Sequence, residues 1–254
     1  MIKRIKTIVR AVKLGLKQNQ GEENIIEKYP DFTSIEWQIY NIVKDKTMTS
    51  PERVITLLRA VEYILHNNIE GDIVECGVWK GGSMMAIAEL LTTLGQENRE
   101  LYLYDTFEGM NQPNDVDISI DGIVASDYLE IKERHENDHV WAYSQLEEVT
   151  KNMASTNYPS DKLIYVQGTV EETIPRVMPE KIALLRLDTD WYASTKHELT
   201  YLFPKLVVGG VLIIDDYGHW QGCKQAVDEY FKENEIKIFF NRIDYTGRLG
   251  IKNA

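Results

Sequence analysis

Residues 71–83, Gly-Asp-Ile-Val-Glu-Cys-Gly-Val-Trp-Lys-Gly-Gly-Ser, indicate the fold class, because they predict a buried strand, a glycine-rich turn and a helix in succession. The apolar run over 72–76 indicates the strand, and the spaced apolar residues of 83–94 indicate the helix. Glycines at such a turn let the backbone bend tightly and approach a ligand closely. In doubly wound sheets, ligands bind outside the carboxyl ends of the strands, so this turn is the first candidate site.

The same alternation of strand and helix continues along the chain. Further strands are predicted at 101–105, 163–167, 182–188 and 211–215, and further helices at 171–177, 194–202 and 222–234. Repeated strand–helix units predict a parallel sheet with helices on both faces. The tail differs, because its sequence indicates a hairpin, with one strand over 236–243, a turn at 245–247 and a second strand over 248–252. We therefore expect an α/β domain with a mostly parallel seven-stranded sheet and an antiparallel hairpin at its edge.

A helix is also predicted to begin at residue 51. Ser50 suits the N-cap, Pro51 suits the first helical position, and Glu52 favours the positive end of the helix. Val54, Leu57, Leu58, Val61, Ile64 and Leu65 would form its buried face. The preceding residues, 1–47, are expected to form a helical extension, and residues 48–254 the main domain.

The first 20 residues carry six basic side chains and no acid, with apolar residues at helical spacing. This pattern predicts a basic amphipathic helix. It could pack on the domain or on a second copy of the chain, which would make a homo-oligomer, or it could contact a membrane surface. All three alternatives stay open at the level of sequence.

Composition excludes several classes of protein. With 40 acidic and 28 basic residues the formal net charge is −12, which disfavours a nucleic acid as the main partner. No apolar run approaches the length of a membrane-spanning helix. The two cysteines, Cys76 and Cys223, cannot build a disulfide framework or a four-cysteine zinc site. They suggest a reducing compartment, so we expect a cytoplasmic protein.

Carboxylates follow two neighbouring predicted strands. Asp188 ends one strand and is followed by Asp190, and Asp215 and Asp216 end the next. Gathered at one edge of the sheet without a partner, these groups would repel one another and resist ionisation. A hard cation resolves this, and oxygen ligands with room for water and substrate suit Mg²⁺. The alternative is that Asp215 and Asp216 serve as helix caps or ion-pair partners.

Asp105, at the tip of the 101–105 strand, is a candidate ribose ligand, since an acid there commonly accepts hydrogen bonds from a ribose diol. The alternative is a solvated acid at a strand end. The turn at 77–82 is not the dinucleotide pattern G-x-G-x-x-G, and it lacks the Gly-Lys-Ser/Thr ending of a phosphate loop.

The segment 110–143 is rich in acids and lacks clear periodicity, which predicts a lid or binding loop. A calcium loop starting at Asp117 fails, because the twelfth position is Tyr128 where a glutamate is needed. His135 and His139 lie in this segment, and His219 follows the second acidic pair. Each is interpreted as a surface histidine, although His219 could reach the site.

Taken together and in order, several segments resemble the macrocin O-methyltransferase (TylF-like) family. They are 48–53, 71–82, 105–109, 168–175, 185–190, 215–218 and 222–228. The resemblance implies a Rossmann-like class I fold, with S-adenosylmethionine as methyl donor, Mg²⁺ as metal, and a sugar hydroxyl of a natural product or glycan as acceptor. The domain over 48–254 would then be the methyltransferase domain.

The resemblance also implies roles for matching residues. Asp188, Asp215 and Asp216 would bind Mg²⁺, with Asp188 as general base. Glu75, Cys76, Gly77, Val78 and Trp79 would line the methionine end of the cofactor. The other implied cofactor-binding residues are Thr47, Met48, Asp105, Thr106, Phe107, Glu108, Gly109, Glu171 and Glu172.

The chain departs from the family pattern at Thr189, where glycine is common, at Trp191, and over 110–143, which should shape the acceptor pocket. The acceptor therefore stays open. Three other functions remain alternatives: a methyltransferase for catechol-like phenols, a nucleotide-dependent oxidoreductase, and a non-catalytic cofactor-binding scaffold.

Overall fold

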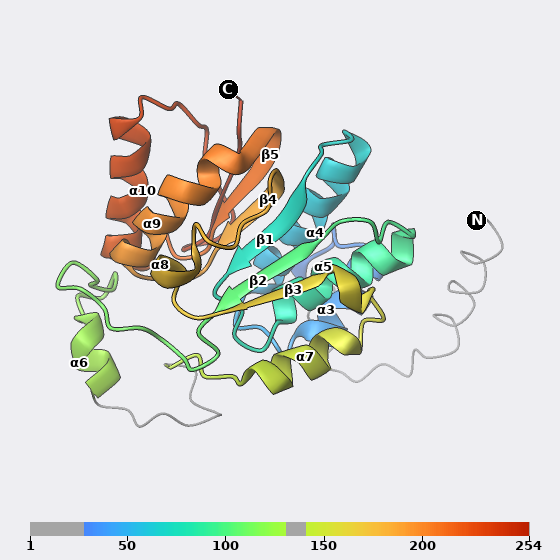
Figure 1. Ribbon diagram of the computed structural model, residues 1–254, viewed down its shortest axis with the longest axis horizontal. Coiled ribbons are helices and arrows are strands. Elements are labelled where there is room, and N and C mark those ends of the chain that lie inside the picture. Colours follow the sequence, from blue (N-terminus) through green and yellow to red (C-terminus); the bar gives the residue numbers. More distant parts are fainter. Residues whose placement is uncertain (1–27, 131–140, 254) are drawn as a thin grey trace. The chain divides into compact units, whose positions relative to one another are not determined.

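Seven strands form one sheet in the computed structural model, which describes residues 28–130 and 141–253 (Figure 1). Their order is β3-β2-β1-β4-β5-β7-β6. The strands are β1 (Asp72–Cys76), β2 (Leu101–Asp105), β3 (Leu163–Gln167), β4 (Ile182–Leu187), β5 (Leu206–Ile214), β6 (Asn241–Arg242) and β7 (Arg248–Ile251). The pairs from β3 across to β5 are parallel, while β7 is antiparallel to both β5 and β6. This confirms the predicted α/β sheet and its antiparallel edge.

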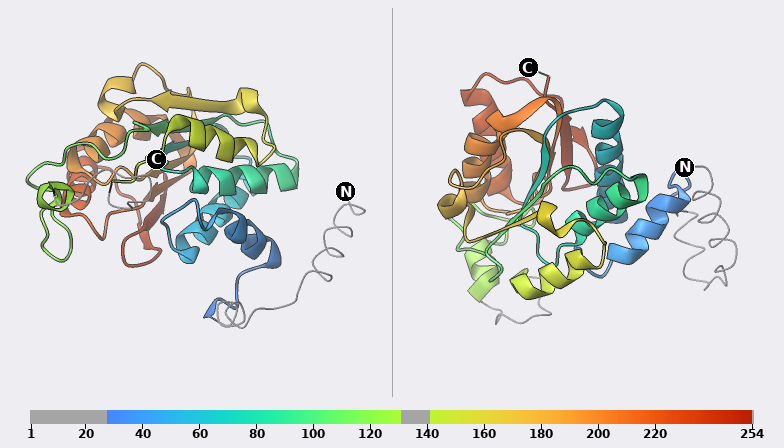
Figure 2. Two further views of the ribbon diagram at one scale, coloured as in Figure 1. Left: turned by 90° about the horizontal axis from the view of Figure 1, so that it is seen from below. Right: turned by 45° about the vertical axis from the view of Figure 1, so that its right-hand side comes forward.

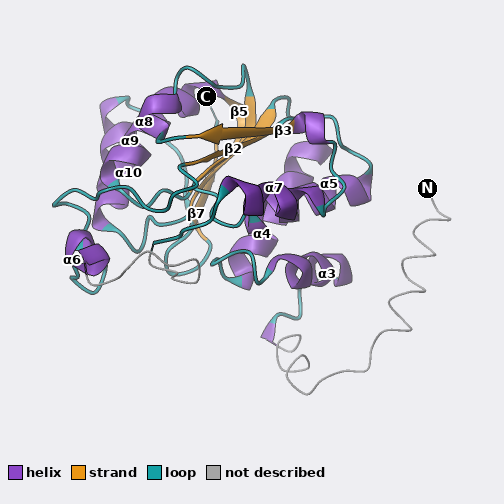
Figure 3. Cartoon of the chain, turned by 60° about the horizontal axis from the view of Figure 1, so that its bottom comes forward, coloured by secondary structure: helices purple, strands orange, loops and turns teal. Residues whose placement is uncertain are grey.

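Helices cover both faces of this sheet (Figure 2). One layer contains α4 (Pro51–His66), α5 (Gly82–Leu94) and α7 (Leu146–Ala154), and the other contains α8 (Val170–Thr173), α9 (Tyr192–Leu202) and α10 (Gln221–Glu233). Figure 3 shows the two layers on opposite sides of the strands. The short helix α6 (Ala125–Glu130) lies within the predicted lid segment. A sheet covered on both faces explains why its central strands are mostly apolar.

Helix α4 begins as predicted. The Ser50 hydroxyl accepts a hydrogen bond from the Arg53 amide, and Pro51 occupies the first turn. Val54, Leu57, Leu58, Val61 and Ile64 are buried, whereas Leu65 is only partly buried. This start matters for function, because it fixes Arg53 at the end of the helix that faces the carboxyl edge of the sheet.

Two compact units make up the chain, 1–37 and 38–254, with α3 (Ser34–Val43) spanning the division. The predicted extension over 1–47 and domain over 48–254 stay predictions. The predicted basic helix, His135 and His139 lie outside the described residues. Among the helices that are described, none combines the length and the apolar character that crossing a membrane requires.

Three predicted boundaries were wrong by more than two residues. The helix expected over 171–177 ends at Thr173, because Ile174 precedes Pro175 and adopts extended backbone angles. Strand β5 starts at Leu206 rather than 211, continuing through the Gly209–Gly210 pair. In the hairpin, only Asn241 and Arg242 of the expected 236–243 strand pair with β7.

Candidate active site

The carboxyl edge of the central strands brings the predicted site segments together. The Gly77 amide donates to the Tyr104 carbonyl at 2.8 Å, and the Asp188 amide donates to the Cys76 carbonyl at 2.9 Å. One strand further, the Asp215 amide donates to the Leu187 carbonyl at 2.9 Å. The sheet ladder thus continues past the strand ends and fixes the backbone at each site residue.

Gly77 shows how tightly these loops approach. Its φ is +81°, and a Cβ built there would lie 2.1 Å from the Asp188 carbonyl oxygen. Only glycine fits at this position, because any side chain would push the two loops apart. The glycine-rich turn therefore serves to bring the backbone of β1 against the loop that carries Asp188.

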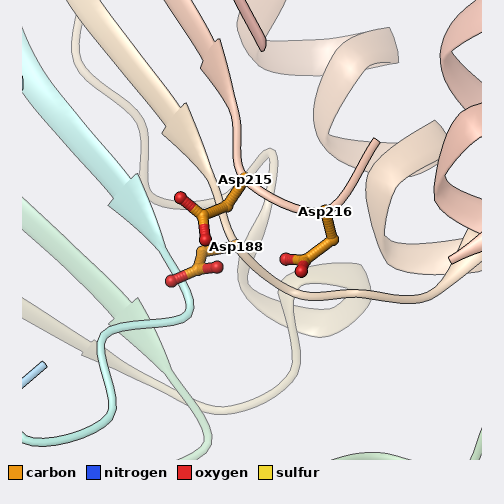
Figure 4. Close-up of side chains that lie close together, drawn as sticks. All are labelled: Asp188, Asp215 and Asp216. Atoms are coloured by element: carbon orange, nitrogen blue, oxygen red, sulfur yellow. The ribbon is translucent and has the colours of Figure 1, made fainter. Parts of the chain in front are cut away.

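Asp188, Asp215 and Asp216 form a cluster of carboxylates (Figure 4). Each offers one oxygen, and these oxygens lie within 4.8 Å of one another. The sequence prediction that these three acids meet at one edge is confirmed by this geometry. Asp190 lines one cavity together with these three acids, and burial raises the pKa of Asp190 to about 7.

Arg186 is a buried cation beneath this cluster. It lies on β4 with 4% of its side chain exposed, and contacts three carboxylates. Its guanidinium donates to Asp188 Oδ2 and to Asp215 Oδ1, both at 2.7 Å, and to Glu75. Arg53 adds a second guanidinium, which pairs with Asp215 and lies 3.0 Å from Asp244. The two arginines thus hold the orientation of the acidic groups.

The pKa values of the three clustered aspartates shift in different directions in this environment. Burial raises the pKa of Asp188 well above its usual range, an effect that Arg186 opposes and the neighbouring acids reinforce. Burial also raises the pKa of Asp216, with Asp190 and Asp215 adding to the rise. Burial acts in the same direction on Asp215, but Arg186 and Arg53 outweigh it and lower the pKa of that group.

The site suits a divalent cation. Five carboxyl groups, on Glu75, Asp188, Asp190, Asp215 and Asp216, line one cavity together with three basic side chains, Lys46, Arg53 and Arg186. Oδ2 of Asp216 is buried without a hydrogen-bond partner. A bound cation would partner that oxygen and offset the repulsion that raises the pKa of Asp188 and Asp216. Hard oxygen donors of this kind favour Mg²⁺.

Two cavities meet at this cluster. The first lies against the glycine-rich turn and the tip of β2, and the second, of about 330 Å³, lies against Asp188, Asp215 and Asp216. Five residues line both cavities: Met48, Trp79, Asp188, Asp190 and Trp191. The volume of the second cavity lies at the lower end of the range of small-molecule pockets, roughly 300–1,000 Å³, and the first cavity, of about 110 Å³, is smaller. The arrangement provides two adjoining ligand spaces with Asp188 between them.

Asp105 has a structural role in addition to the predicted one. Its carboxylate accepts hydrogen bonds from the amides of Val78 and Trp79, at 2.8 and 3.0 Å, and from the Phe107 amide at 2.8 Å. It therefore holds the glycine-rich turn to the end of β2. Asp105 also lines the first cavity, so its predicted contact with a ribose stays a prediction.

The other predicted cofactor-binding residues fall into four groups. Gly77, Trp79, Thr106, Gly109 and Met48 line the first cavity, while Thr47, Glu75 and Val78 line the second. Glu108 and Glu172 line a third hollow beside Thr106 and Gly168. The side chains of Cys76 and Phe107 are buried, Glu171 is exposed, and none of the three lines these cavities. All these roles stay predictions.

The prediction from sequence missed Arg53 and Arg186 as site residues. Arg186 interrupts the apolar run of β4, and a charge inside a buried strand needs partners. Arg53 lies in the first turn of α4, where the helix dipole disfavours a cation. Each position therefore carried a signal that the residue is held by acids from elsewhere in the fold.

The chain is similar in sequence and in fold to known O-methyltransferases. Residues 13–249 match the family described as macrocin-O-methyltransferase (TylF). The chain is 33% identical over 201 residues to demethyldecarbamoylnovobiocin O-methyltransferase of Streptomyces niveus, covering 79% of this chain and 73% of the relative. It is also 33% identical, with the same coverage, to a Streptomyces olivaceus enzyme named 8-demethyl-8-(2,3-dimethoxy-alpha-L-rhamnosyl)-tetracenomycin-C 4'-O-methyltransferase. The solved structure of the O-methyltransferase NovP has a TM-score of 0.70 and 32% identity, covering 82% of this chain and 83% of NovP.

Proposed function

We propose that this chain, which belongs to the macrocin O-methyltransferase family and is therefore an S-adenosylmethionine-dependent O-methyltransferase, methylates a sugar hydroxyl with the help of a divalent cation. The observation that carries the proposal is the position of Asp188, which lines both cavities and belongs to the carboxylate cluster. A donor in the first cavity and an acceptor in the second would meet at that residue.

The cofactor residues support the donor side of this proposal. S-adenosylmethionine carries an electrophilic methyl group, so the protein has to bring an oxygen into line with it. We assign the first cavity to the cofactor, with Gly77 and Trp79 beside its methionine end and Asp105 and Thr106 beside its ribose. Met48 would cover it from the side of α4. The acidic surroundings also suit the positive charge of the sulfonium.

The carboxylates support the acceptor side. A divalent cation at Asp188, Asp215 and Asp216 would lower the pKa of an acceptor hydroxyl and stabilise the negative charge on its oxygen. Asp188 is our candidate general base, since Arg186 fixes its orientation from below and its carboxylate borders both cavities. A sugar with adjacent hydroxyls suits the site, because two oxygens would define which one reacts.

Of the alternative functions, the oxidoreductase is excluded and the phenol methyltransferase is kept. The oxidoreductase alternative is set aside, because the family match identifies a methyltransferase. A catechol-like phenol remains a second candidate acceptor, since aromatic side chains line the second cavity, among them Tyr128, Trp220 and Tyr245. Sugars also pack on aromatic faces, and the rhamnosyl group in the name of one relative favours the sugar.

An acceptor panel tests the proposed function. The panel contains demethyldecarbamoylnovobiocin, rhamnosylated tetracenomycin and catechol, each offered with methyl-labelled S-adenosylmethionine. We expect label in at least one of the first two compounds, a fall in transfer of about 100-fold or more in EDTA, and recovery with Mg²⁺, since a metal supplies several kcal/mol of charge stabilisation. Transfer that is undiminished in EDTA, or transfer to catechol alone, would contradict the proposal.

A further inference from the structure

The turn between β6 and β7 borders the second cavity. Strand β7 pairs with β5 so that Arg248 lies opposite Ile214, the last residue of β5. The turn that precedes Arg248 is therefore placed beside the carboxyl end of β5, where Asp215 and Asp216 follow. Tyr245, in this turn, lines the cavity together with the metal-site aspartates.

Asp244 fixes this turn to the start of α4. Its Oδ1 accepts hydrogen bonds from the amides of Thr246, at 2.9 Å, and Gly247, at 2.7 Å. Its Oδ2 accepts from the Ser50 hydroxyl at 3.0 Å and pairs with Arg53 at 3.0 Å. A carboxylate with four such contacts holds the turn in one conformation, as a supporting contact for a binding site should.

A second set of contacts ties the turn to the loop after β5. The Thr246 hydroxyl donates to the Asp215 carbonyl at 2.8 Å, and the Gly218 amide donates to the Thr246 carbonyl at 2.9 Å. A Cβ built on Gly218 would lie 2.1 Å from the Tyr245 carbonyl oxygen. The backbone of Tyr245 is thus held rigidly against the loop that carries the metal-site acids.

The side chain of Tyr245 extends from this rigid frame into open space. It is 53% exposed, although it lines a cavity. Its hydroxyl lies 3.4 Å from Nδ1 of His219, and the two rings are 6.0 Å apart at 85°. His219 in turn packs edge-on against Trp220, with ring centroids 4.9 Å apart. Both side chains therefore present an apolar body and a polar tip beside the acids.

We propose that Tyr245 and His219 form the surface that binds the acceptor sugar and selects the hydroxyl that reaches Asp188. An aromatic side chain costs little conformational entropy on binding, especially when its backbone is fixed in advance. The ring face of Tyr245 would pack on the C–H groups of the sugar, and the Tyr245 hydroxyl and the His219 ring would hydrogen-bond the sugar's hydroxyl groups. This inference rests on the proposed function, which supplies the sugar.

The test is the binding of methyl α-L-rhamnopyranoside, followed by NMR titration in the presence of S-adenosylhomocysteine and Mg²⁺. Tyr245→Ala is expected to weaken glycoside binding about tenfold or more and Tyr245→Phe about threefold, since stacking and the hydroxyl are lost separately. S-adenosylhomocysteine binding, measured by calorimetry, should stay within about twofold of wild type in both. Tyr245→Phe keeps the ring, so it tests the inference even if the alanine variant folds poorly.

Tyr201→Ala is the matched control. Tyr201 lies on α9, is 39% exposed, and packs against His197 with ring centroids 4.7 Å apart, but lines neither of the two adjoining cavities. This variant should bind the glycoside like wild type. If both Tyr245 variants match Tyr201→Ala, the inference is overturned while the proposed function stands. If wild type binds S-adenosylhomocysteine but not the glycoside, the proposed acceptor class fails and the inference falls with it.

Discussion

Asp188→Asn is expected to lower the rate of methyl transfer by about 10³-fold or more, while S-adenosylhomocysteine binding stays within about threefold of wild type. The substitution keeps the size of the side chain but removes both the proton acceptor and a negative charge from the carboxylate cluster. Because Asp188 borders both cavities, its loss should affect the reacting oxygen rather than the adenosine end of the cofactor. Single-turnover kinetics with labelled donor would measure the rate, and calorimetry the binding.

Asp161→Asn provides the control for this experiment. Asp161 is an exposed acid in a short helical turn before β3, and it lines none of the three cavities. Its substitution should leave both transfer and binding unchanged. Transfer by Asp188→Asn at more than a tenth of the wild-type rate would refute the role of Asp188 as general base and metal ligand.

Arg186→Met is expected to destabilise the metal-free protein by roughly 3–5 kcal/mol, because it leaves buried acids without their shared cation. Arg186 contacts Glu75, Asp188 and Asp215 at once, and only 4% of its side chain is exposed. Methionine fills much of the same volume without the charge. For a chain of this length the loss corresponds to a fall in Tm of roughly 10 °C, measured by thermal denaturation in EDTA.

The exposed Arg176 is the matched control for this loss of stability. Its guanidinium donates to the Glu172 carbonyl and is exposed. Arg176→Met should change Tm by no more than about 2 °C, as surface substitutions usually do. For Arg186→Met, added Mg²⁺ should restore part of the lost stability, since a cation bound to the same acids would replace some of the missing charge. A Tm within 2 °C of wild type in EDTA would show that Arg186 does not hold the cluster together.

The sequence was sufficient to predict the sheet and the meeting of the three aspartates. Parallel strands end at one edge, so acids that follow neighbouring apolar strands had to lie close together, whatever the exact register. The glycine-rich turn was predicted from its own residues, because glycines follow a predicted strand and precede a predicted helix. These features depend on local pattern and topology, which a single sequence carries directly.

Contacts between distant segments were not predictable in this way. Arg53 and Asp215 are 162 residues apart, and Ser50 and Asp244 are 194 apart, yet both pairs shape the site. No periodic pattern encodes which acid a given arginine will meet. The hydrogen bonds from the glycine-rich turn to Asp105 were missed as well, because they depend on backbone geometry rather than on residue type.

The hairpin of β6 and β7 shows a second limit of prediction from sequence, which concerns strand pairing. Ile236, Ile238 and Phe240 are partly buried and pack against the core, while Lys237 and Phe239 are exposed. Within the segment expected to form a strand over 236–243, partly buried and exposed side chains therefore alternate over 236–240. This alternation reports which side of the chain is buried and not which backbone groups pair, and pairing with β7 is limited to Asn241 and Arg242.

The proposed methyl transfer depends on one cation held by three acids beside the methyl donor. Anomalous diffraction from a crystal soaked in Mn²⁺ and S-adenosylhomocysteine tests this most directly, since Mn²⁺ accepts the same oxygen ligands as Mg²⁺ and is located by its own signal. We predict a single strong peak in contact with Asp188, Asp215 and Asp216. Density that shows no ion there at saturating Mn²⁺, with Arg53 and Arg186 still paired to Asp215, would contradict a metal-assisted reaction at these acids.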